Sequence, residues 1–217
     1  MFSDQRRLDK PGQAVSADLP LEVRATGTPY VSRGGVKLAH ALDHFNVDPT
    51  GRVALDVGAS TGGFTDVLLQ RGARLVYAVD VGHGQLDWRL RNDPRVVVLE
   101  RTNARHLTHA LIPQPADLVV CDASFISLSL VLPAALQLAP AGGRLVALIK
   151  PQFEVGKGRV GKGGVVRDPA LHAEVCDQIA RWLEAEGWQV QGLTPSPLTG
   201  PKGNREFLIC ALRGGLA

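Results

Sequence analysis

Short apolar runs alternate with amphipathic stretches along most of the chain. Five runs rich in Val, Leu and Ile are interpreted as strands, at residues 53–56, 75–80, 96–99, 117–121 and 144–149. Helical patterns lie between them at residues 63–70, 85–91 and 128–138. Continuous apolar strands separated by helices predict a parallel sheet that is covered by helices on both faces.

The pattern continues at both ends of this core. A helical period at residues 36–45 precedes the first strand, and an amphipathic helix is predicted at 169–186, with Asp168 as its N-cap. Two further strands, at 188–193 and 206–212, complete the alternation. The fold class is therefore α/β, with a doubly wound, mostly parallel seven-stranded sheet and an antiparallel last strand.

Residues 1–30 depart from this pattern. They contain three prolines and two glycines, with one short apolar alternation at 19–23, and are interpreted as a linker. Residues 31–217 are expected to form one domain, because 217 residues with 45% hydrophobic content can bury a full core.

Charge and composition exclude several classes of protein. The net charge of +3 is compatible with an anionic partner but does not require one. No apolar run approaches the roughly 20 residues that span a bilayer, and the N-terminus lacks the apolar core of a signal peptide, so a cytoplasmic protein is expected. The three cysteines are interpreted as buried free thiols, and the six histidines show no ligand spacing with them, so no metal site is expected.

A glycine-rich turn follows the first strand and opens the next helix. The turn runs from Asp56 to Phe64 and does not have the G-x-G-x-x-G spacing of the dinucleotide fingerprint. A second strand ends about 20 residues later at Asp80, where a carboxylate can accept both hydroxyls of a ribose. We predict that the turn cradles the amino-acid end of S-adenosylmethionine (SAM).

Four charged residues lie where the predicted strands and the first helix leave apolar surroundings. They are Lys37, Asp122, Lys150 and Glu206. If the last strand is antiparallel, its beginning meets the ends of the parallel strands, and the four side chains converge beside the glycine turn. A lysine there can act as a base, or stay charged and stabilise a developing alkoxide. The alternative is that each charge only marks the end of a strand.

Several motifs in order resemble the TlyA (hemolysin A-like) family of FtsJ-type RNA methyltransferases. The resemblance extends from about residue 8 to 213, and the motifs lie at 32–38, 56–64, 80–86, 100–105, 121–127, 150–154 and 203–206. It implies a Rossmann-like class I methyltransferase that transfers a methyl group from SAM to the ribose 2′-hydroxyl of cytidine in ribosomal RNA, in ribosomes or their subunits. It also implies a catalytic Lys-Asp-Lys-Glu tetrad, formed by the same four charged residues.

The resemblance further implies which residues contact the cofactor. They are Asp56, Gly58, Ser60, Thr61, Gly62, Gly63, Phe64, Asp80, Thr102, Asn103 and Asp122, with Thr102 and Asn103 against the adenine. Members of the family usually begin with a small S4-type RNA-binding domain. Only its last strand region is matched here, at residues 8 to about 23, so residues 1–30 are expected to hold a remnant of it.

RNA contacts are expected from four cations. The glycine-rich loop at 156–167 carries Lys157, Arg159 and Lys162 and is interpreted as a flap over the target ribose, and Arg33 is a candidate phosphate contact. Phe125 and Phe153 are candidates either for base stacking or for core packing. A membrane-active hemolysin and a methyltransferase for small-molecule hydroxyls remain as alternatives, and the sequence does not indicate the oligomeric state.

Overall fold

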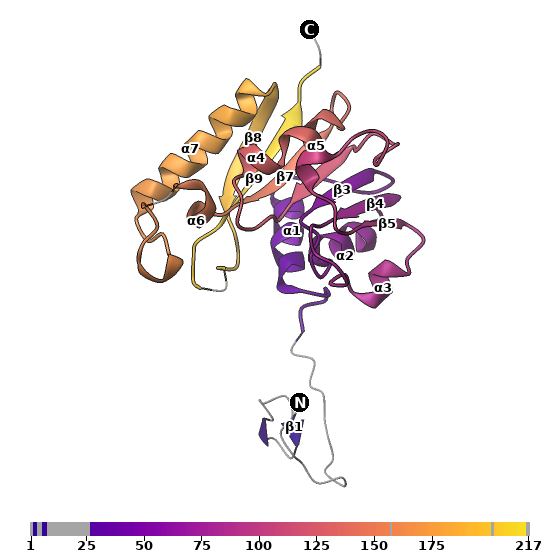
Figure 1. Ribbon diagram of the computed structural model, residues 1–217, viewed down its shortest axis with the longest axis horizontal. Coiled ribbons are helices and arrows are strands. Elements are labelled where there is room, and N and C mark those ends of the chain that lie inside the picture. Colours follow the sequence, from indigo (N-terminus) through magenta and orange to yellow (C-terminus); the bar gives the residue numbers. More distant parts are fainter. Residues whose placement is uncertain (1, 4–5, 8–26, 157, 201, 216–217) are drawn as a thin grey trace.

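A seven-stranded sheet forms the centre of the computed structural model, which describes residues 2–3, 6–7, 27–156, 158–200 and 202–215. The strands of this sheet follow the order β5-β4-β3-β6-β7-β9-β8. Their bounds are β3 Val53–Val57, β4 Leu75–Val79, β5 Val96–Leu99, β6 Leu118–Cys121, β7 Arg144–Ile149, β8 Trp188–Pro195 and β9 Phe207–Arg213. Figure 1 shows the sheet running across the molecule.

Strand direction agrees with the prediction. β3, β4, β5, β6 and β7 pair in parallel, whereas β9 inserts antiparallel between β7 and β8. The start of β9 therefore lies beside the end of β7, with Phe207 opposite Ile149. This pairing brings Glu206, just before β9, next to Lys150, just after β7.

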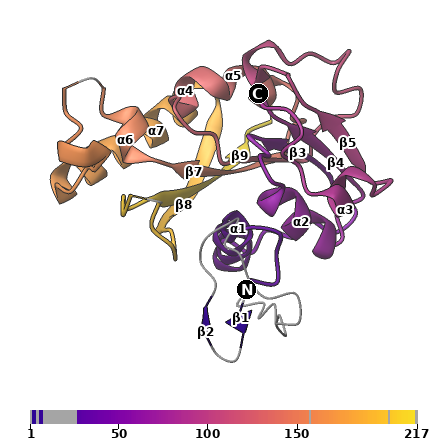
Figure 2. The same ribbon diagram turned by 60° about the horizontal axis from the view of Figure 1, so that its bottom comes forward.

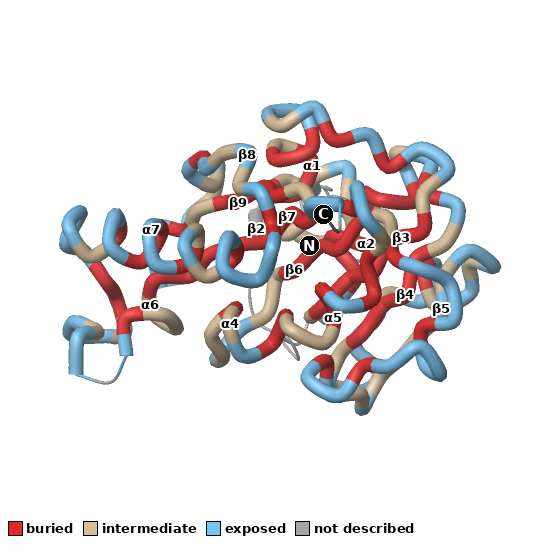
Figure 3. Tube along the Cα trace, turned by 90° about the horizontal axis from the view of Figure 1, so that it is seen from above, coloured by how far each residue is buried: buried red, intermediate tan, exposed pale blue. Residues whose placement is uncertain are grey.

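Helices cover both faces of the sheet (Figure 2). One face packs against α1 (Arg33–His44), α2 (Gly63–Gln70) and α3 (Trp88–Arg91). The other face packs against α4 (Leu128–Val131), α5 (Pro133–Gln137) and α7 (Pro169–Ala185). Successive residues of β3 point to opposite faces, so that Leu55 joins one core and Ala54 the other. Figure 3 shows the buried segments concentrated along the central strands.

Three short elements lie in the connections near the carboxyl ends of the parallel strands. They are η1 (Ala104–His106), α6 (Pro151–Glu154) and η2 (Lys162–Gly164). Because α6 begins directly after Lys150, it lies near the residues that follow β6 and those that precede β9. All three cysteines are free and buried, as predicted, and burial raises the pKa of Cys121 to about 12.

Two predicted helices differ from the observed ones. The helix expected at 128–138 is divided into α4 and α5, because Pro133 has no N–H to donate and instead starts a new helix. The helix expected at 85–91 begins only at Trp88, where the Asp87 side chain accepts from the Arg89 N–H. The N-cap predicted at Asp168 is confirmed, since its side chain accepts from the Ala170 N–H.

The N-terminal region contributes one short pairing, between β1 (Phe2–Ser3) and β2 (Arg6–Arg7), which are antiparallel. The expected S4 remnant at residues 8 to 23 falls outside the described residues. None of the helices in the described ranges has the length and apolar character needed to cross a membrane.

Asp56 is a carboxylate inside the core. It belongs to β3, is 0% exposed, and accepts a hydrogen bond from Thr65 Oγ1 at 2.7 Å through Oδ2. Its Oδ1 has no hydrogen-bond partner in the described part of the chain. Desolvation, opposed by the Thr65 hydrogen bond and reinforced by Asp122 and Asp80, raises the pKa of Asp56 to about 7.

We predict that Asp56→Asn changes how stability depends on pH. An aspartate in the unfolded chain titrates near pH 3.9, so between about pH 4 and 7 only the native state holds this proton. The contribution of Asp56 to stability therefore falls as pH rises through this window, whereas asparagine stays neutral. In urea denaturation, the free energy of unfolding of the variant relative to that of wild type should increase by on the order of 3 kcal/mol from pH 5 to pH 8.

The matched control for this experiment is Asp48→Asn. Asp48 is exposed, and hydrogen bonds from Thr50 lower its pKa, so it does not titrate between pH 5 and 8. A wild-type pH profile in the Asp56 variant would show that this carboxyl carries no buried proton.

Candidate active site

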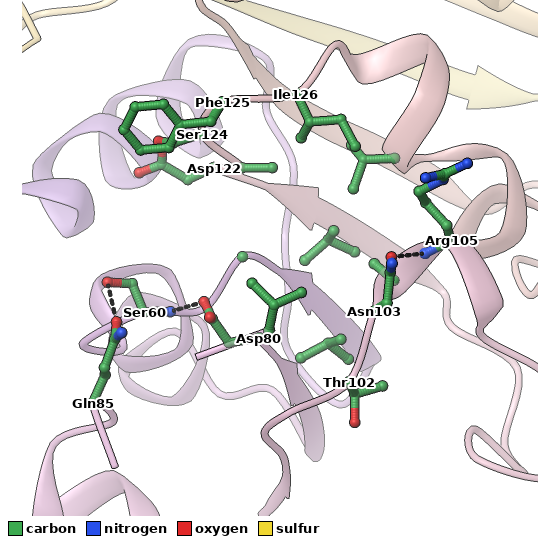
Figure 4. A pocket seen from close by; sticks show the side chains of 17 residues that line it. Ser60, Asp80, Gln85, Thr102, Asn103, Arg105, Asp122, Ser124, Phe125 and Ile126 are labelled. Carbon is green, nitrogen blue, oxygen red and sulfur yellow. Dashed lines mark hydrogen bonds between the residues drawn. The ribbon is translucent and has the colours of Figure 1, made fainter. Parts of the chain in front are cut away.

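A cavity of about 490 Å³ lies beyond the carboxyl ends of β3, β4 and β6. Figure 4 shows Asp122, Ser124 and Phe125 on one side of it, Ser60, Asp80 and Gln85 on another, and Thr102 and Asn103 on a third. A position beyond the carboxyl ends of parallel strands is where doubly wound sheets bind their ligands. Of the expected cofactor contacts, six line this cavity: Gly58, Ser60, Asp80, Thr102, Asn103 and Asp122.

Asp80 is held in place by backbone donors. Its Oδ2 accepts from the Ser60 N–H at 2.8 Å and its Oδ1 from the Gly82 N–H at 2.6 Å. Each carboxylate oxygen has a further lone pair, so the group can still accept two hydroxyls from a ligand in the cavity.

Glycines are needed in this turn for close packing as well as for ligand access. Gly58 has φ +84°, and a Cβ there would lie 3.0 Å from the backbone of Ala123, so only glycine lets the turn approach the loop after β6. A side chain at Gly62 would meet Leu90, and Gly62 is not among the residues that line the cavities.

Two of the expected cofactor contacts, Asp56 and Gly62, do not line either cavity. Asp56 lies beneath the cavity with no exposed surface, and Gly62 packs against α3. The other residues of the turn, Thr61, Gly63 and Phe64, line a smaller cavity of about 160 Å³ together with Ser32 and Gly34 at the start of α1, and Asp122, Ser124 and Lys150.

Lys150 and Asp122 form one ion pair of the predicted quartet. Lys150 Nζ lies 2.7 Å from Asp122 Oδ1 and donates to Asp122 O at 3.2 Å and to Ser124 Oγ at 2.7 Å. Three oxygen atoms thus surround a group that carries three protons when charged. The surroundings of Lys150 Nζ match an ammonium.

Lys37 and Glu206 form the second pair, at greater depth. Lys37 Nζ donates to Glu206 Oε2 at 2.5 Å, and the two side chains are 10% and 2% exposed. Lys37 comes from α1 and Glu206 from the residue before β9, so residues 169 positions apart meet through the packing of α1 on the sheet. Each charge is tolerated in the interior because it has an opposite partner.

Both pairs open into one cavity of about 610 Å³. Its lining comprises the four charged residues Lys37, Asp122, Lys150 and Glu206. The other lining residues are Ser124, Phe125, Gln152, Phe153, Val160, Gly164, Lys202 and Asn204. Asp122, Ser124 and Phe125 also line the 490 Å³ cavity. The predicted convergence is thus observed, and two cavities meet at Asp122. No cluster of three or more potential metal ligands is present in the described residues.

Backbone strain is concentrated at this site. In the part of the chain that the structure describes, four residues other than glycine have positive φ. Of these, Ser60 and Phe125 line the 490 Å³ cavity, and Arg101 precedes Thr102 in its wall. Such conformations persist where the surroundings enforce them and cluster at functional sites. Phe125, at φ +66°, is 89% exposed and its ring centroid lies 5.0 Å from that of Phe153, so core packing is excluded for Phe125.

Glu100 anchors the loop at 81–85 that forms one wall of the 490 Å³ cavity. The Gly84 N–H, then Arg91 and His83, lower the pKa of Glu100 to about 2. Its carboxylate contacts Arg91 Nη2 at 2.5 Å and His83 Nδ1 at 3.1 Å. Through these contacts Glu100 links the loop to α3.

The four cations expected to contact RNA differ in their exposure and in their hydrogen-bond partners. Both terminal guanidinium nitrogens of Arg159 bond to Glu174 at 2.6 Å. Lys162 is exposed in η2, Arg33 is exposed and donates to Thr199 O at 3.1 Å, and Lys157 lies outside the described residues.

The expected flap at 156–167 is anchored on the side that follows η2. Asn204 accepts from the Val166 N–H and donates to Gly164 O, both at 2.9 Å. His172 Nε2 lies 2.9 Å from Val166 O. These contacts tie the loop to α7 and to the segment before β9.

Three functional candidates were missed from the sequence. Ser124, Gln152 and Asn204 each lie two positions from a member of the charged quartet, and all three line the 610 Å³ cavity. The sequence feature that could have indicated them is a polar residue close to a charge at the end of a strand. Polar residues are common in loops, so this feature alone does not single them out.

Comparison with known proteins identifies relatives of this chain. Over 201 residues the chain is 55% identical to the 16S/23S rRNA (cytidine-2′-O)-methyltransferase TlyA of Mycobacterium tuberculosis, covering 92% of this chain and 75% of that protein. A crystal structure described as a candidate hemolysin from Lactococcus lactis superposes with a TM-score of 0.83 at 47% identity, covering 86% of this chain and 89% of that one.

The fold class is confirmed by a more distant structure. A SAM-dependent methyltransferase from Mesorhizobium loti has a TM-score of 0.59 at 15% identity, covering 80% of this chain and 96% of that one. At that identity the likeness concerns the fold alone. The model of the FtsJ-like methyltransferases matches residues 30–213, which include every element from α1 to β9. The family expected from the motifs is confirmed, and the chain belongs to the FtsJ-like methyltransferases.

Proposed function

We propose that this chain transfers the methyl group of SAM to the ribose 2′-hydroxyl of a cytidine in ribosomal RNA. The observation that carries the proposal is the meeting of two cavities at Asp122, one suited to the cofactor and one lined by both ion pairs. The printed activity of the Mycobacterium relative, at 55% identity, supports the same reaction. A ribosomal substrate would place the enzyme in the cytoplasm.

The 490 Å³ cavity fits SAM by the chemistry of its lining. Asp80 is oriented by two backbone N–H groups to accept the ribose hydroxyls, and Thr102 and Asn103 stand where the adenine is expected. The glycine turn and the smaller cavity beside it suit the methionine part. SAM supplies an electrophilic methyl group on a positively charged sulfur, so the protein has mainly to position the attacking oxygen.

We assign Lys150 as the catalytic residue nearest that oxygen. With three oxygen partners around Nζ, the ammonium form fits the site, and an ammonium stabilises negative charge as it develops on the 2′-oxygen. Asp122 orients Lys150 and faces both cavities. Of the two roles that the sequence leaves open, we favour electrostatic stabilisation.

The rival functions fit the site less well. A small neutral substrate would not need the exposed ring of Phe125, whereas an extruded nucleotide base can stack on such a ring. A membrane-active hemolysin has no use for two ion pairs around a cavity. A liposome-leakage assay separates this last alternative from the enzyme.

Lys150→Ala should lower methyl transfer from labelled SAM to ribosomal subunits by about 10²–10³-fold, because one charged donor at the attacking oxygen is lost. SAM affinity, measured by calorimetry, should stay within about threefold of wild type, since Asp80 and the glycine turn are untouched. Arg181→Ala, an exposed cation on α7, is the control. A loss of SAM affinity that accounts for the whole loss of transfer would contradict the catalytic role of Lys150.

Glu206→Ala should destabilise the protein by about 3–5 kcal/mol in urea denaturation, because Lys37 is left as an unpaired buried charge. The double variant Lys37→Met/Glu206→Leu should recover most of this stability, since hydrophobic replacements of a buried ion pair are often neutral. The recovered protein should bind SAM and still fail to methylate RNA. If the double variant methylates RNA at the wild-type rate, the pair has only a structural role.

Arg33→Ala/Lys162→Ala should flatten the dependence of ribosomal RNA binding on salt. Each lost phosphate contact lowers the slope of log K against log salt concentration by about 0.7–0.9. Arg159→Ala is the matched control and should leave the slope unchanged, because Glu174 already occupies that guanidinium. An equal slope for wild type, the double variant and Arg159→Ala would contradict the proposal that Arg33 and Lys162 contact RNA.

A further inference from the structure

Glu154, the last residue of α6, is a partly buried carboxyl that the proposed reaction does not use. Desolvation raises its pKa, although hydrogen bonds from Ser127 and Leu128 act in the opposite direction. Its Oε2 accepts from Ser127 Oγ at 2.6 Å, and its Oε1 accepts from the Leu128 N–H at 2.9 Å. Both oxygens therefore bind the start of α4, where Ser127 is the N-cap.

The other end of α6 holds the loop that leads into α4. Lys150, the N-cap of α6, donates to Asp122 O at 3.2 Å and to Ser124 Oγ at 2.7 Å. Residues 122–127 connect β6 to α4, so one short helix anchors this loop at both of its ends. Phe125 lies between the two sets of contacts.

Phe125 is a strained and exposed point of this loop. It has φ +66° and is 89% exposed, so neither a favourable backbone conformation nor burial keeps it in place. A conformation of this kind persists where the surrounding structure enforces it. The constraints on Phe125 are the contact of its ring with that of Phe153, at a centroid distance of 5.0 Å, and the anchoring of the loop by α6.

We propose that Glu154 is a positioning residue that holds Phe125 where the target base stacks. Phe125 lines both the 490 Å³ and the 610 Å³ cavity, so its ring stands between the proposed places of the methyl donor and the ribose. Because α6 also carries Phe153, loosening the loop from α6 would separate the two rings. The inference rests on the proposed function, in which Phe125 stacks on an extruded base, and adds the residue that acts through it.

The first test measures methyl transfer to ribosomal subunits at saturating SAM. Glu154→Ala should raise KM for the subunits by about 5–100-fold, because a displaced ring no longer stacks on the base. Stacking holds the base before and during transfer, so kcat should change by less than about twofold. Glu154→Gln should keep KM within about twofold of wild type, because its amide can accept from the Leu128 N–H and donate to Ser127 Oγ.

SAM affinity should equal that of wild type in both variants, since Asp80 and the glycine turn are untouched. Glu184→Ala, which replaces an exposed glutamate of α7, is the control and should leave KM unchanged.

A double-variant cycle tests whether Glu154 acts through Phe125. Phe125→Ala alone should raise KM by a similar factor, and adding Glu154→Ala to it should raise KM further by less than about twofold. Effects that multiply would show that Glu154 does not act through the ring and would overturn the inference. Glu154→Asp, one methylene shorter, replaces the alanine variant in the cycle if that variant does not fold.

The outcomes separate the inference from the function on which it rests. If wild type does not methylate ribosomal subunits, the proposed function fails and the inference fails with it. If wild type is active and Phe125→Ala or Glu154→Ala keeps the wild-type KM, the function stands and the assignment of Glu154 is wrong.

Discussion

The pairing of Lys37 with Glu206 is the interaction on which the arrangement of this site depends. Both charges are buried, and either one alone would be strongly unfavourable in the interior. Their contact at 2.5 Å requires α1 to pack against one face of the sheet and β9 to run antiparallel beside β7. Each of these features brings one charge to the carboxyl ends of the parallel strands, where the second ion pair lies.

That constraint also explains why so many residues near the site serve two purposes. Asp122 directly follows β6, pairs with Lys150 and lines three cavities around the reaction centre. Gly58 leaves room for a ligand and lets the turn after β3 approach the loop after β6. The stability of the fold and the geometry of the site therefore rest on the same contacts, and substitutions there are expected to affect both.

Much of the fold could be predicted because its signals are local. The apolar runs predicted the strand ends to within one residue, except that β8 continues two residues further, to Pro195. Asp168 caps the long helix as expected. The errors also have local causes, since Pro133 divided one helix and Asp87 delayed the start of another. The pairing of Arg159 with Glu174 could not be predicted, because a cation in a glycine-rich loop shows nothing of a partner 15 residues away in α7.

The sequence by itself determined the order of strands and helices, the glycine turn, and the four charges that interrupt apolar surroundings, because periodicity and strand ends are properties of neighbouring residues. Only the tertiary structure decided which of those groups share a cavity. It buried Asp56 beneath the turn, engaged Asn204 between two loops and left Gln152 Oε1 without a hydrogen-bond partner among the residues that the structure describes. Burial and hydrogen-bond partnership depend on residues far apart in the chain, so no local pattern encodes them.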